Sequence, residues 1–436
     1  MAVPLSAYWR LVGSNRNFRR LWLAQVISEM GDWIYCVAIY TLLLELTHSA
    51  KSVAFAFILQ VLPQSFVAPL AGVINDRLSR WRVMIAADLA RSVIVLAMLV
   101  ASRAQAVPLI YVLLLLETVM WAFFEPGRTA TVPNIASGDD LLTANALSAM
   151  TWSLTLALGA GLGGAVAAFF GRNTVFVLDS LSFLASAALL RGMRFTEPHM
   201  TGAKPLGWRD LVDFSPIAEG VRYVARDRRI FALLLVKAGL GFLGAHWVLF
   251  PIFGTRVFPV KMAAGSGGSM LGMSTLMSAS GIGAMLGPVL GGYWAGGRQA
   301  RQRLGILAAF LIFGLGYLML AAAPNLGFAA LAAVFIQGGS SLAWVFSTTL
   351  LQSQTDDRYR GRVFAADTAF AVVAMSLTTS LCGLLIDGGI PVRQLSAASA
   401  LVALLPAAAW ALGMRLFTPD RRTGSPPPSP VSLRAF

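Results

Sequence analysis

The sequence predicts an all-α integral membrane protein whose twelve transmembrane helices form two pseudo-symmetric six-helix bundles. Hydrophobic residues make up 57% of the 436 residues and charged residues 12%, whereas soluble proteins carry about 25% charged residues. The mean hydropathy is +0.70. The apolar residues are gathered into runs of the length that crosses a bilayer, about 20 residues. A sequence echo between the two halves of the chain favours two bundles.

Twelve apolar runs account for most of the chain. They lie near residues 19–45, 52–75, 83–102, 108–130, 145–170, 173–193, 230–252, 268–294, 304–323, 327–351, 363–386 and 395–416. The first run contains Glu29 and Asp32 and lacks a small-residue cleavage site, so we expect a retained span and not a signal peptide.

The chain is expected to divide into four segments. These are an N-terminal bundle (1–193), a cytoplasmic linker (194–229), a C-terminal bundle (230–418) and a disordered cytoplasmic tail (419–436). In the linker, apolar residues recur at helical spacing with arginines on or near the other face, which predicts an amphipathic helix on the membrane surface. Those apolar residues are Phe214, Ile217, Val221 and Val224. The tail is rich in proline, which is typical of disorder.

The basic residues predict the orientation. With both termini on one side, that side holds 25 Lys and Arg residues and the other holds six. The positive-inside rule then places both termini in the cytoplasm. The net charge of +14 is therefore explained by topology. Because the basic residues are scattered over many loops, they do not indicate a nucleic-acid-binding surface.

A short echo relates the two halves. The sequence Pro-Leu-Ala-Gly at 69–72, at the end of the second span, recurs as Pro-Val-Leu-Gly at 288–291, at the end of the eighth. The offset is 219 residues. An echo at equivalent places in two sets of six spans is typical of transporters built from parallel repeats.

A cluster of charge separates the second and third spans. A charge at the centre of a bilayer costs about 2.5 to 3.5 kcal/mol, so the cluster must form a turn outside the lipid. Its pattern resembles the signature loop between helices 2 and 3 of the major facilitator superfamily, with Ser79 and Trp81 replacing a Gly and an Arg. The resemblance implies that Asp76 meets the N-terminal end of span eleven and closes the cytoplasmic side. The residues it assigns to this gate are Gly72, Asp76, Arg77, Arg80 and Glu125.

Further segments narrow the resemblance. The sequence Phe-Phe-Glu-Pro-Gly-Arg at 123–128, followed by Ala-Asn-Ala-Leu at 144–147, is similar to a bacterial drug and siderophore exporter branch that includes macrolide efflux pumps and enterobactin exporters. The segments 218–223, 350–352 and 361–363 are also similar to it. The resemblance extends from residue 18 to about residue 412 and implies the twelve-helix major facilitator fold and a transport function.

The energy source is expected to be a proton gradient, with no cofactor. The sequence has no phosphate-binding loop of the Walker type and no soluble stretch long enough for a nucleotide-binding domain. Proton carriage needs acids inside the membrane, and the candidates are Asp32, Glu29 and Glu117. Glu29 and Asp32 are three residues apart and share a helix face, roughly 14 to 18 Å from the cytoplasmic end of the span. Two such carboxylates cannot both ionise cheaply, so a proton should be exchangeable. Alternatively, either acid serves packing or pairs with Lys237.

The superfamily resemblance implies a central cavity lined by spans one, four, seven and ten. The candidate cavity residues on these spans are Gln25, Trp33, Trp121, Phe124, His246, Trp247, Gln337 and Trp344. Aromatic walls with a few polar groups suit an amphipathic, planar or cationic small molecule. The alternatives are that the aromatic rings face lipid and that the histidine is a hydrogen-bonded core residue.

Small residues recur at four-residue spacing in spans five and eight, which lets helix backbones approach closely. Because these spans face each other across the two halves in the resembled fold, we expect their small residues to line a moving interface. They are Gly159, Gly163, Gly283, Gly287, Pro288 and Gly291.

These observations predict a monomeric, proton-coupled exporter of a small amphipathic molecule in the bacterial inner membrane. Its partners would be that substrate and the lipid bilayer, with no metal ion and no nucleic acid. An uptake permease and a lysophospholipid flippase of the same fold remain alternatives. From other classes, a non-transporting sensor or a membrane-embedded enzyme remains open. Against an enzyme, no pair of histidines at metal-binding spacing and no nucleophile with a base stands out in the sequence.

Overall fold

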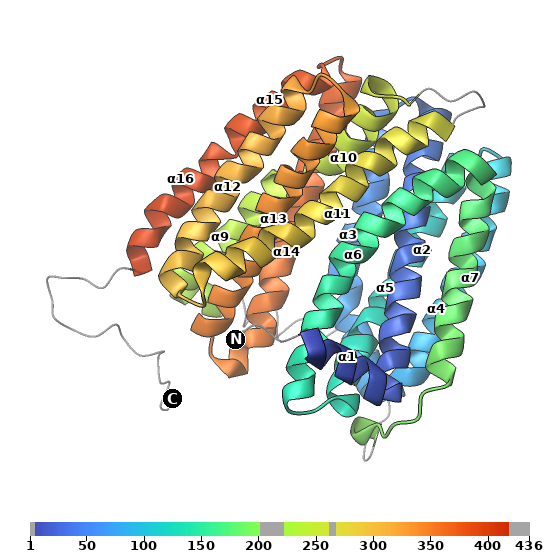
Figure 1. Cartoon of the computed structure of the whole chain (residues 1–436), viewed down its shortest axis with the longest axis vertical. Helices are drawn as coiled ribbons and strands as arrows, with labels where there is room; N and C mark the ends of the chain where they lie inside the picture. Colours follow the sequence, from blue (N-terminus) through green and yellow to red (C-terminus); the bar gives the residue numbers. More distant parts are fainter. Residues whose placement is uncertain (1–4, 201–221, 261–266, 418–436) are drawn as a thin grey trace, which may run out of the picture.

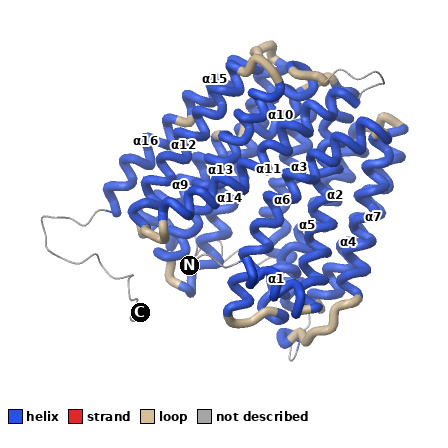
Figure 2. The backbone as a smooth tube through the Cα atoms, in the orientation of Figure 1, coloured by secondary structure: helices blue, strands red, loops and turns tan. Residues whose placement is uncertain are grey.

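The computed structural model describes residues 5–200, 222–260 and 267–417, and this part of the chain consists of helices joined by short loops, with no β-strand (Figure 2). Twelve of its helical segments are long and apolar enough to cross a membrane. Helices are required there because lipid offers no partner to backbone polar groups, so each segment must satisfy its own. The predicted fold class is confirmed.

The first half of the chain forms one bundle (Figure 1). Its helices are α1 (Leu5–Ser14), α2 (Arg16–Thr47), α3 (Ala50–Arg77), α4 (Arg80–Arg103), α5 (Val107–Ile135), α6 (Asp139–Phe170) and α7 (Arg172–Arg191), followed by a 3-10 turn, Pro198–Met200. The short helix α1 was not predicted. It packs against α2 and α6, and its Leu11 is buried. Asn15 fixes the turn into α2: its side chain accepts the N–H of Phe18 and donates to the carbonyl of Ile135, as N-cap residues do.

The second half contains spans seven to twelve. Its helices are α9 (Arg228–Phe242), α10 (His246–Ile252), α11 (Gly267–Ala295), α12 (Gln299–Ala322), α13 (Leu326–Gln354), α14 (Asp357–Asp387), α15 (Val392–Val402) and α16 (Leu404–Gly413), with a π turn at Phe253–Val257 and a 3-10 turn at Met414–Phe417.

Span seven is broken between α9 and α10. The break frees backbone groups inside the bundle, and the buried hydroxyl of Tyr317 supplies their partners: it donates to the carbonyl of Leu243 and accepts the N–H of His246 at 3.0 Å. A broken helix is tolerated at this depth because protein groups satisfy it.

The two halves repeat one packing pattern. In the first half α2 packs on α6 and α7, α4 packs on α5 and α7, and α3 packs on α5. In the second half the equivalent spans make the equivalent contacts: α9 packs on α14 and α16, α12 on α13 and α15, and α11 on α13. Across the halves α6 packs on α11 and α3 on α14. The bundles are therefore pseudo-symmetric, as predicted.

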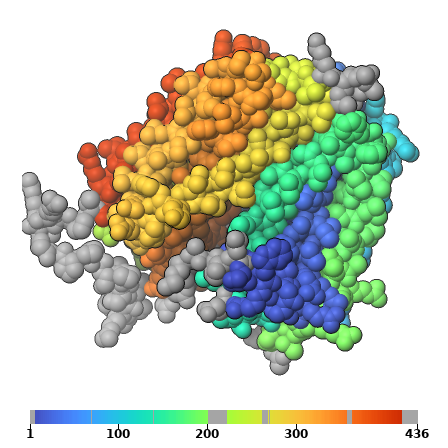
Figure 3. All heavy atoms as spheres, in the orientation of Figure 1, coloured from blue at the N-terminus to red at the C-terminus, as the bar shows by residue number. Residues whose placement is uncertain are grey.

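We call the end of the bundle at which α2 begins the inner side, because the arginines predict it to be cytoplasmic, and the opposite end the outer side. In Figure 1, α6 and α11 lie side by side toward the outer side and diverge toward the inner side. The space-filling view shows their atoms meeting along this boundary (Figure 3). There a side chain at Gly281 would collide with Ala157. Asp387 and Arg256 of the second half bind backbone groups at the outer ends of α3 and α2.

Parts of the predicted linker and tail lie outside the described residues. Phe214, Ile217 and Val221 of the predicted amphipathic helix fall there, as does the tail from residue 418. Residues 222–226 are helical, and Val224 within them is buried. The predicted boundaries of the four segments stay predictions.

Candidate functional site

The centre of the first bundle holds a buried arginine shared by carboxylates from three helices. Arg91 of α4 is 1% exposed. Its Nη2 lies 2.7 Å from Oδ1 of Asp32 on α2 and 2.7 Å from Oε1 of Glu117 on α5, and its Nη1 lies 3.9 Å from Oδ1 of Asp88. The guanidinium also lies over the ring of Phe183, 4.0 Å from its centroid. Two of the three predicted proton carriers thus meet at one cation.

Acids outnumber the arginine in this cluster. Asp179 of α7 is fully buried, interacts electrostatically with Asp32, Glu117 and Arg91, and has one carboxylate oxygen without a hydrogen-bond partner among the described residues. Three carboxyl groups thus lie within 4 Å of the guanidinium, and Asp179 is a fourth acid near them. Uncompensated buried charge is costly, so these acids depend on Arg91 for compensation. We call Asp32, Asp88, Arg91, Glu117 and Asp179 the arginine cluster.

Glu29 does not form a carboxylate pair with Asp32, although the two are three residues apart. Glu29 accepts hydrogen bonds from Nε2 of Gln25 at 2.8 Å and from Oγ1 of Thr155 on α6 at 3.1 Å. The two acids diverge because each has polar partners on a different neighbouring helix. Neither acid pairs with Lys237, which binds Asp367.

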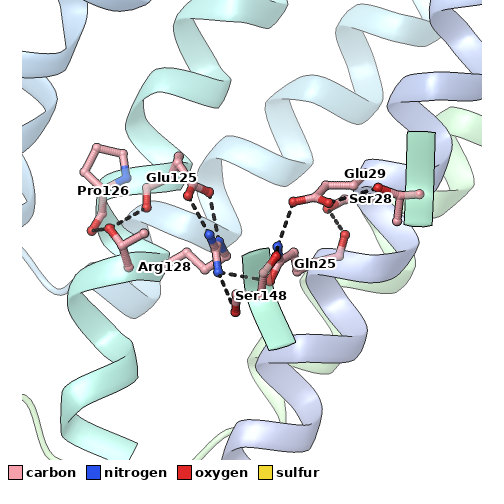
Figure 4. A network of polar contacts seen from close by, with 9 residues as sticks. Gln25, Ser28, Glu29, Glu125, Pro126, Arg128 and Ser148 are labelled. Carbon is pink, nitrogen blue, oxygen red and sulfur yellow. Dashed lines mark hydrogen bonds and ion pairs between the residues drawn. The ribbon is translucent and has the colours of Figure 1, made fainter. Parts of the chain in front are cut away.

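A second polar network joins Glu29 to the inner end of α5 (Figure 4). Arg128 lies 2.5 Å from Oε1 of Glu125 and donates to Oε1 of Gln25 at 3.0 Å, and Gln25 donates to Glu29. The side chain of Glu125 is 27% exposed and that of Arg128 is 8% exposed. Sequence reasoning missed Arg128 as a site residue, although it closes the Pro-Gly-Arg stretch that carries the family resemblance.

Asp76 and Arg80 of the predicted gating loop bind groups of the first bundle. Asp76 forms an ion pair with Arg80 at 3.1 Å, and the Asp76 side chain is 71% exposed. Arg80 also donates to the carbonyls of Asn75 and Ala130. Glu125, which was also assigned to the gate, forms its ion pair with Arg128, whereas Arg80 forms its own with Asp76. Gly72 and Arg77 lie in the last turns of α3.

Two of the predicted cavity tryptophans meet across the halves. The rings of Trp33 on α2 and Trp247 on α10 are stacked, with centroids 6.3 Å apart and an interplanar angle of 11°. Phe57 of α3 stacks on Trp247 at 5.2 Å, and Trp152 of α6 meets Trp33 edge-on at 5.8 Å. Sequence reasoning missed Phe57 and Trp152, which lie on spans two and five. We call these four rings the aromatic stack.

Several predicted cavity residues lie elsewhere. Phe124 is buried in the inner core of the first bundle with Phe18 and Met84, so it is a core residue. His246 is buried among aromatic rings of the second bundle, including Phe313, as the alternative interpretation held. Gln25 belongs to the Arg128 network, Gln337 is buried, and Trp121 is half-buried.

The second bundle has its own buried ion pair. Nζ of Lys237 on α9 binds Oδ2 of Asp367 on α14, with side chains 3% and 1% exposed. The same Nζ lies 4.2 Å from the ring centroid of Trp344 on α13. The predicted cavity residue Trp344 is thus a partner of this pair, and it is 37% exposed.

The predicted interface glycines pack inside each half. A Cβ at Gly159 or Gly163 would meet α2, at Trp33 and Ile34 respectively. Those at Gly283, Gly287 and Gly291 would meet α13, at Val334, Gly338 and Leu342 respectively. Pro288 lies in the same stretch of α11. The expectation that these residues line the boundary between the halves is corrected, since the close approach there involves Gly161, Gly164 and Gly281. Four-residue spacing predicts close packing but not which neighbour is packed.

Comparison with known proteins identifies the family. A family model described as transmembrane secretion effector matches residues 12–426. The chain belongs to this family. It is a transporter of the major facilitator superfamily, in the drug exporter branch, which confirms the resemblance inferred from its loop motifs. Among the described residues of this transporter, no group of His, Cys, Asp and Glu is arranged to hold a metal ion.

Curated relatives align with most of the transporter. It is 25% identical over 383 residues to the uncharacterized MFS-type transporter YkuC of Bacillus subtilis (strain 168), covering 85% of this chain and 86% of that one. It is 24% identical over 385 residues to macrolide efflux protein A of Streptococcus pyogenes, covering 87% and 90%. It is 22% identical over 373 residues to the putative bacilysin exporter BacE of Bacillus subtilis (strain 168), covering 85% and 88%.

Solved structures share the fold. An auto-inhibited POT family peptide transporter superposes with a TM-score of 0.69 at 13% identity, covering 92% of this chain and 97% of that one. The nucleoside transporter NupG gives 0.67 at 12% identity, covering 92% and 99%. An inward-facing, occupied bacterial homolog of the lysosomal transporter Spinster gives 0.66 at 13% identity, covering 96% and 98%. These likenesses establish the fold of the transporter and leave its substrate open.

Proposed function

We propose that this transporter is a proton-coupled exporter that expels a small amphipathic molecule from the bacterial cytoplasm by alternating access. The observation that carries the proposal is the arginine cluster, in which Asp32 and Glu117 share the guanidinium of Arg91. Twelve membrane-spanning helices support an inner-membrane location, and the distribution of Lys and Arg supports cytoplasmic termini.

Protonation of the arginine cluster would change how three helices are held together. Arg91 ties α2, α4 and α5 to one another through Asp32 and Glu117. A proton on either acid removes one of the charges that bind Arg91, which weakens the contact between that helix and α4. The Asp32 side chain is 27% exposed, whereas that of Glu117 is 10% exposed. Asp32 is therefore the acid through which a proton would enter.

Glu29 is a second candidate for proton binding. It lies one helical turn from Asp32 and is linked through Gln25 to Arg128 and Glu125. Because Glu125 is partly exposed near the inner end of α5, this chain of polar groups supports a route between that end and the centre of the bundle. Arg128 would act as a positioning residue that orients Gln25 and Glu125.

The aromatic stack supports an amphipathic substrate with a flat or cationic part. Trp33 is adjacent to Asp32 in α2, and the stack joins the two bundles. Aromatic faces attract cations, and a carboxylate beside them would add to that attraction. The names of the relatives, a macrolide efflux protein and a putative bacilysin exporter, support export as the direction. An uptake permease of the same fold would move its substrate inward, and a flippase would move lipid between leaflets.

A susceptibility panel tests the proposal. Cells that overproduce the transporter are expected to tolerate higher concentrations of some amphipathic compounds, including macrolides, than cells that lack it. Asp32→Asn should abolish that tolerance at matched membrane levels. The control is Asp140→Asn, which removes an exposed acid whose ion pair with Arg10, 3.4 Å long, is worth little. Equal tolerance in all strains to every compound would contradict export, and greater sensitivity in the overproducer would indicate uptake.

A further inference from the structure

A groove runs along the flank of the second bundle at the inner side, between α9 and α16. It encloses about 370 Å³. Its walls are mainly apolar and come from both helices, and they include Phe231, Leu235, Trp410, Gly413 and Leu416. Gly413 lies beside Ala232 across the groove, where a Cβ would be 3.6 Å from the Ala232 Cβ.

Arginines surround the inner end of this groove. Arg228 lines it directly. Arg229 donates its Nε to the carbonyl of Leu416 at 3.0 Å. The guanidinium of Arg303, on α12, lies 5.3 Å from the ring centroid of Phe417, and the indole N–H of Trp410 donates to the Arg303 carbonyl at 2.9 Å.

These arginines have no acidic partner in the part of the chain that the structure describes. Asp227 is next to them, but its side chain caps α9 by accepting the N–H of Arg229 at 2.7 Å. No ion pair involves Arg228, Arg229 or Arg303 among the described residues. An anion from outside the protein would therefore meet positive charge that the described protein does not neutralise.

The apolar part of the groove faces the membrane. Phe231 and Leu235 are each 46% exposed, and they lie one and two turns into α9, roughly 5 to 10 Å from its start. Exposed apolar side chains at this depth contact acyl chains. The ligand that fits must then carry a negative charge at one end and hydrocarbon at the other, with its charge at the inner surface.

We propose that this groove binds an anionic phospholipid of the inner leaflet, with the phosphate group beside Arg228 and Arg303 and an acyl chain along Phe231 and Leu235. Charge complementarity selects an anionic headgroup, because basic residues at the membrane surface attract anionic lipid. The bound lipid would bridge spans seven and twelve. The proposal is independent of the transported substrate and of the energy source.

Binding to purified full-length protein in a neutral detergent tests this site. We expect phosphatidylglycerol to raise the thermal unfolding midpoint, and phosphatidylcholine with the same acyl chains to leave it unchanged. The combination of Arg228→Gln and Arg303→Gln should weaken phosphatidylglycerol binding about 30-fold. The matched control is Arg298→Gln with Arg301→Gln, which removes two exposed arginines on the same side, outside the groove. It should bind as the wild type does.

A second variant keeps every arginine and fills the groove. Ala409 lines the groove and is exposed, so Ala409→Trp should reduce retention of phosphatidylglycerol in native mass spectrometry several-fold. Glycerol phosphate alone should give no stabilisation. Equal binding of both phospholipids, wild-type affinity in the double arginine variant, undiminished retention in Ala409→Trp, or stabilisation by glycerol phosphate would each overturn the proposal.

Discussion

The carboxylate of Asp387, at the outer end of α14, accepts the backbone N–H of Ala50, the first residue of α3, at 2.7 Å. It also accepts the N–H of Lys51 at 3.1 Å and the hydroxyl of Ser49. One acid of the second half thus satisfies the free N–H groups at the start of a helix of the first half, where the helix dipole favours negative charge. Nearby, Arg256 donates to the carbonyl of His48 at 2.9 Å, so two residues of the second half bind the outer end of the first.

Removing Asp387 should loosen the outer side. Ala54 is buried, and its Cβ would lie 3.0 Å from a Cβ at Gly383 of α14, so it reports on this contact. In a protein with Cys36 and Cys382 replaced by Ala, we expect a cysteine introduced at Ala54 to react several-fold faster with an impermeant maleimide once Asp387→Ala is added. Glu45→Ala, which removes an outer ion pair within the first half, at 2.6 Å from Arg172, is the control. Unchanged labelling in Asp387→Ala would show that this cap does not hold the halves together.

Removing Asp76 is expected to have the opposite effect of removing Asp387: it should favour the state that is closed on the outer side. It lies at the inner end of α3 and is exposed, so the present arrangement does not depend on it. The superfamily resemblance assigns it a contact with the start of span eleven in the state that is closed on the inner side. Asp76→Asn should therefore raise the population of the arrangement described here and slow maleimide labelling at position 54. Faster labelling, or the same rate as in the exposed control Asp140→Asn, would reject this role.

The Lys237–Asp367 pair provides a stability test. Removing one member of a buried pair leaves an uncompensated charge and costs about 3 to 5 kcal/mol, whereas replacing both with apolar residues is close to neutral. Lys237→Met is therefore expected to lower the unfolding midpoint in detergent strongly, and Lys237→Met with Asp367→Leu to recover most of the loss. If Lys237→Met and Asp367→Leu, each made alone, kept the wild-type unfolding midpoint, the pair would not be buried as described.

Two glycines of α11 form a matched comparison. A Cβ at Gly287 would collide with the carbonyl oxygen of Gly338 on α13, whereas one at Gly292 would meet nothing within 4 Å. Gly287→Ala should destabilise the protein by about 1 to 3 kcal/mol through overpacking, and Gly292→Ala should leave stability unchanged or improve it slightly. Equal thermal unfolding midpoints for the two variants would contradict the described packing of α11 on α13.

The fold was predictable from the sequence because lipid imposes strong rules. Apolar runs of fixed length and one-sided basic loops specify twelve spans. The short α1 escaped detection because ten residues cannot form a span. The break in span seven was also missed, since it depends on the hydroxyl of Tyr317, 74 positions beyond Leu243 in the chain.

The candidate site was only partly predictable. Acids inside apolar spans are rare and conspicuous, so Asp32 and Glu117 were identified individually. Their common partner Arg91 depends on how α2, α4 and α5 are rotated about their axes, which no spacing rule gives. Because helix rotation does not follow from spacing, the prediction also paired Glu29 with Asp32 and assigned Gly159 and Gly283 to the wrong interface.

The most direct test of the central claim is accumulation of a compound to which the transporter confers resistance, measured in everted membrane vesicles with an acid interior. The wild type should accumulate it until a protonophore collapses the gradient. Asp32→Asn should still bind the compound but fail to accumulate it, and Glu117→Gln should be impaired in the same way, because both acids share Arg91. If Asp32→Asn and Glu117→Gln, separately and together, accumulate the compound as the wild type does, the arginine cluster does not carry the coupling proton.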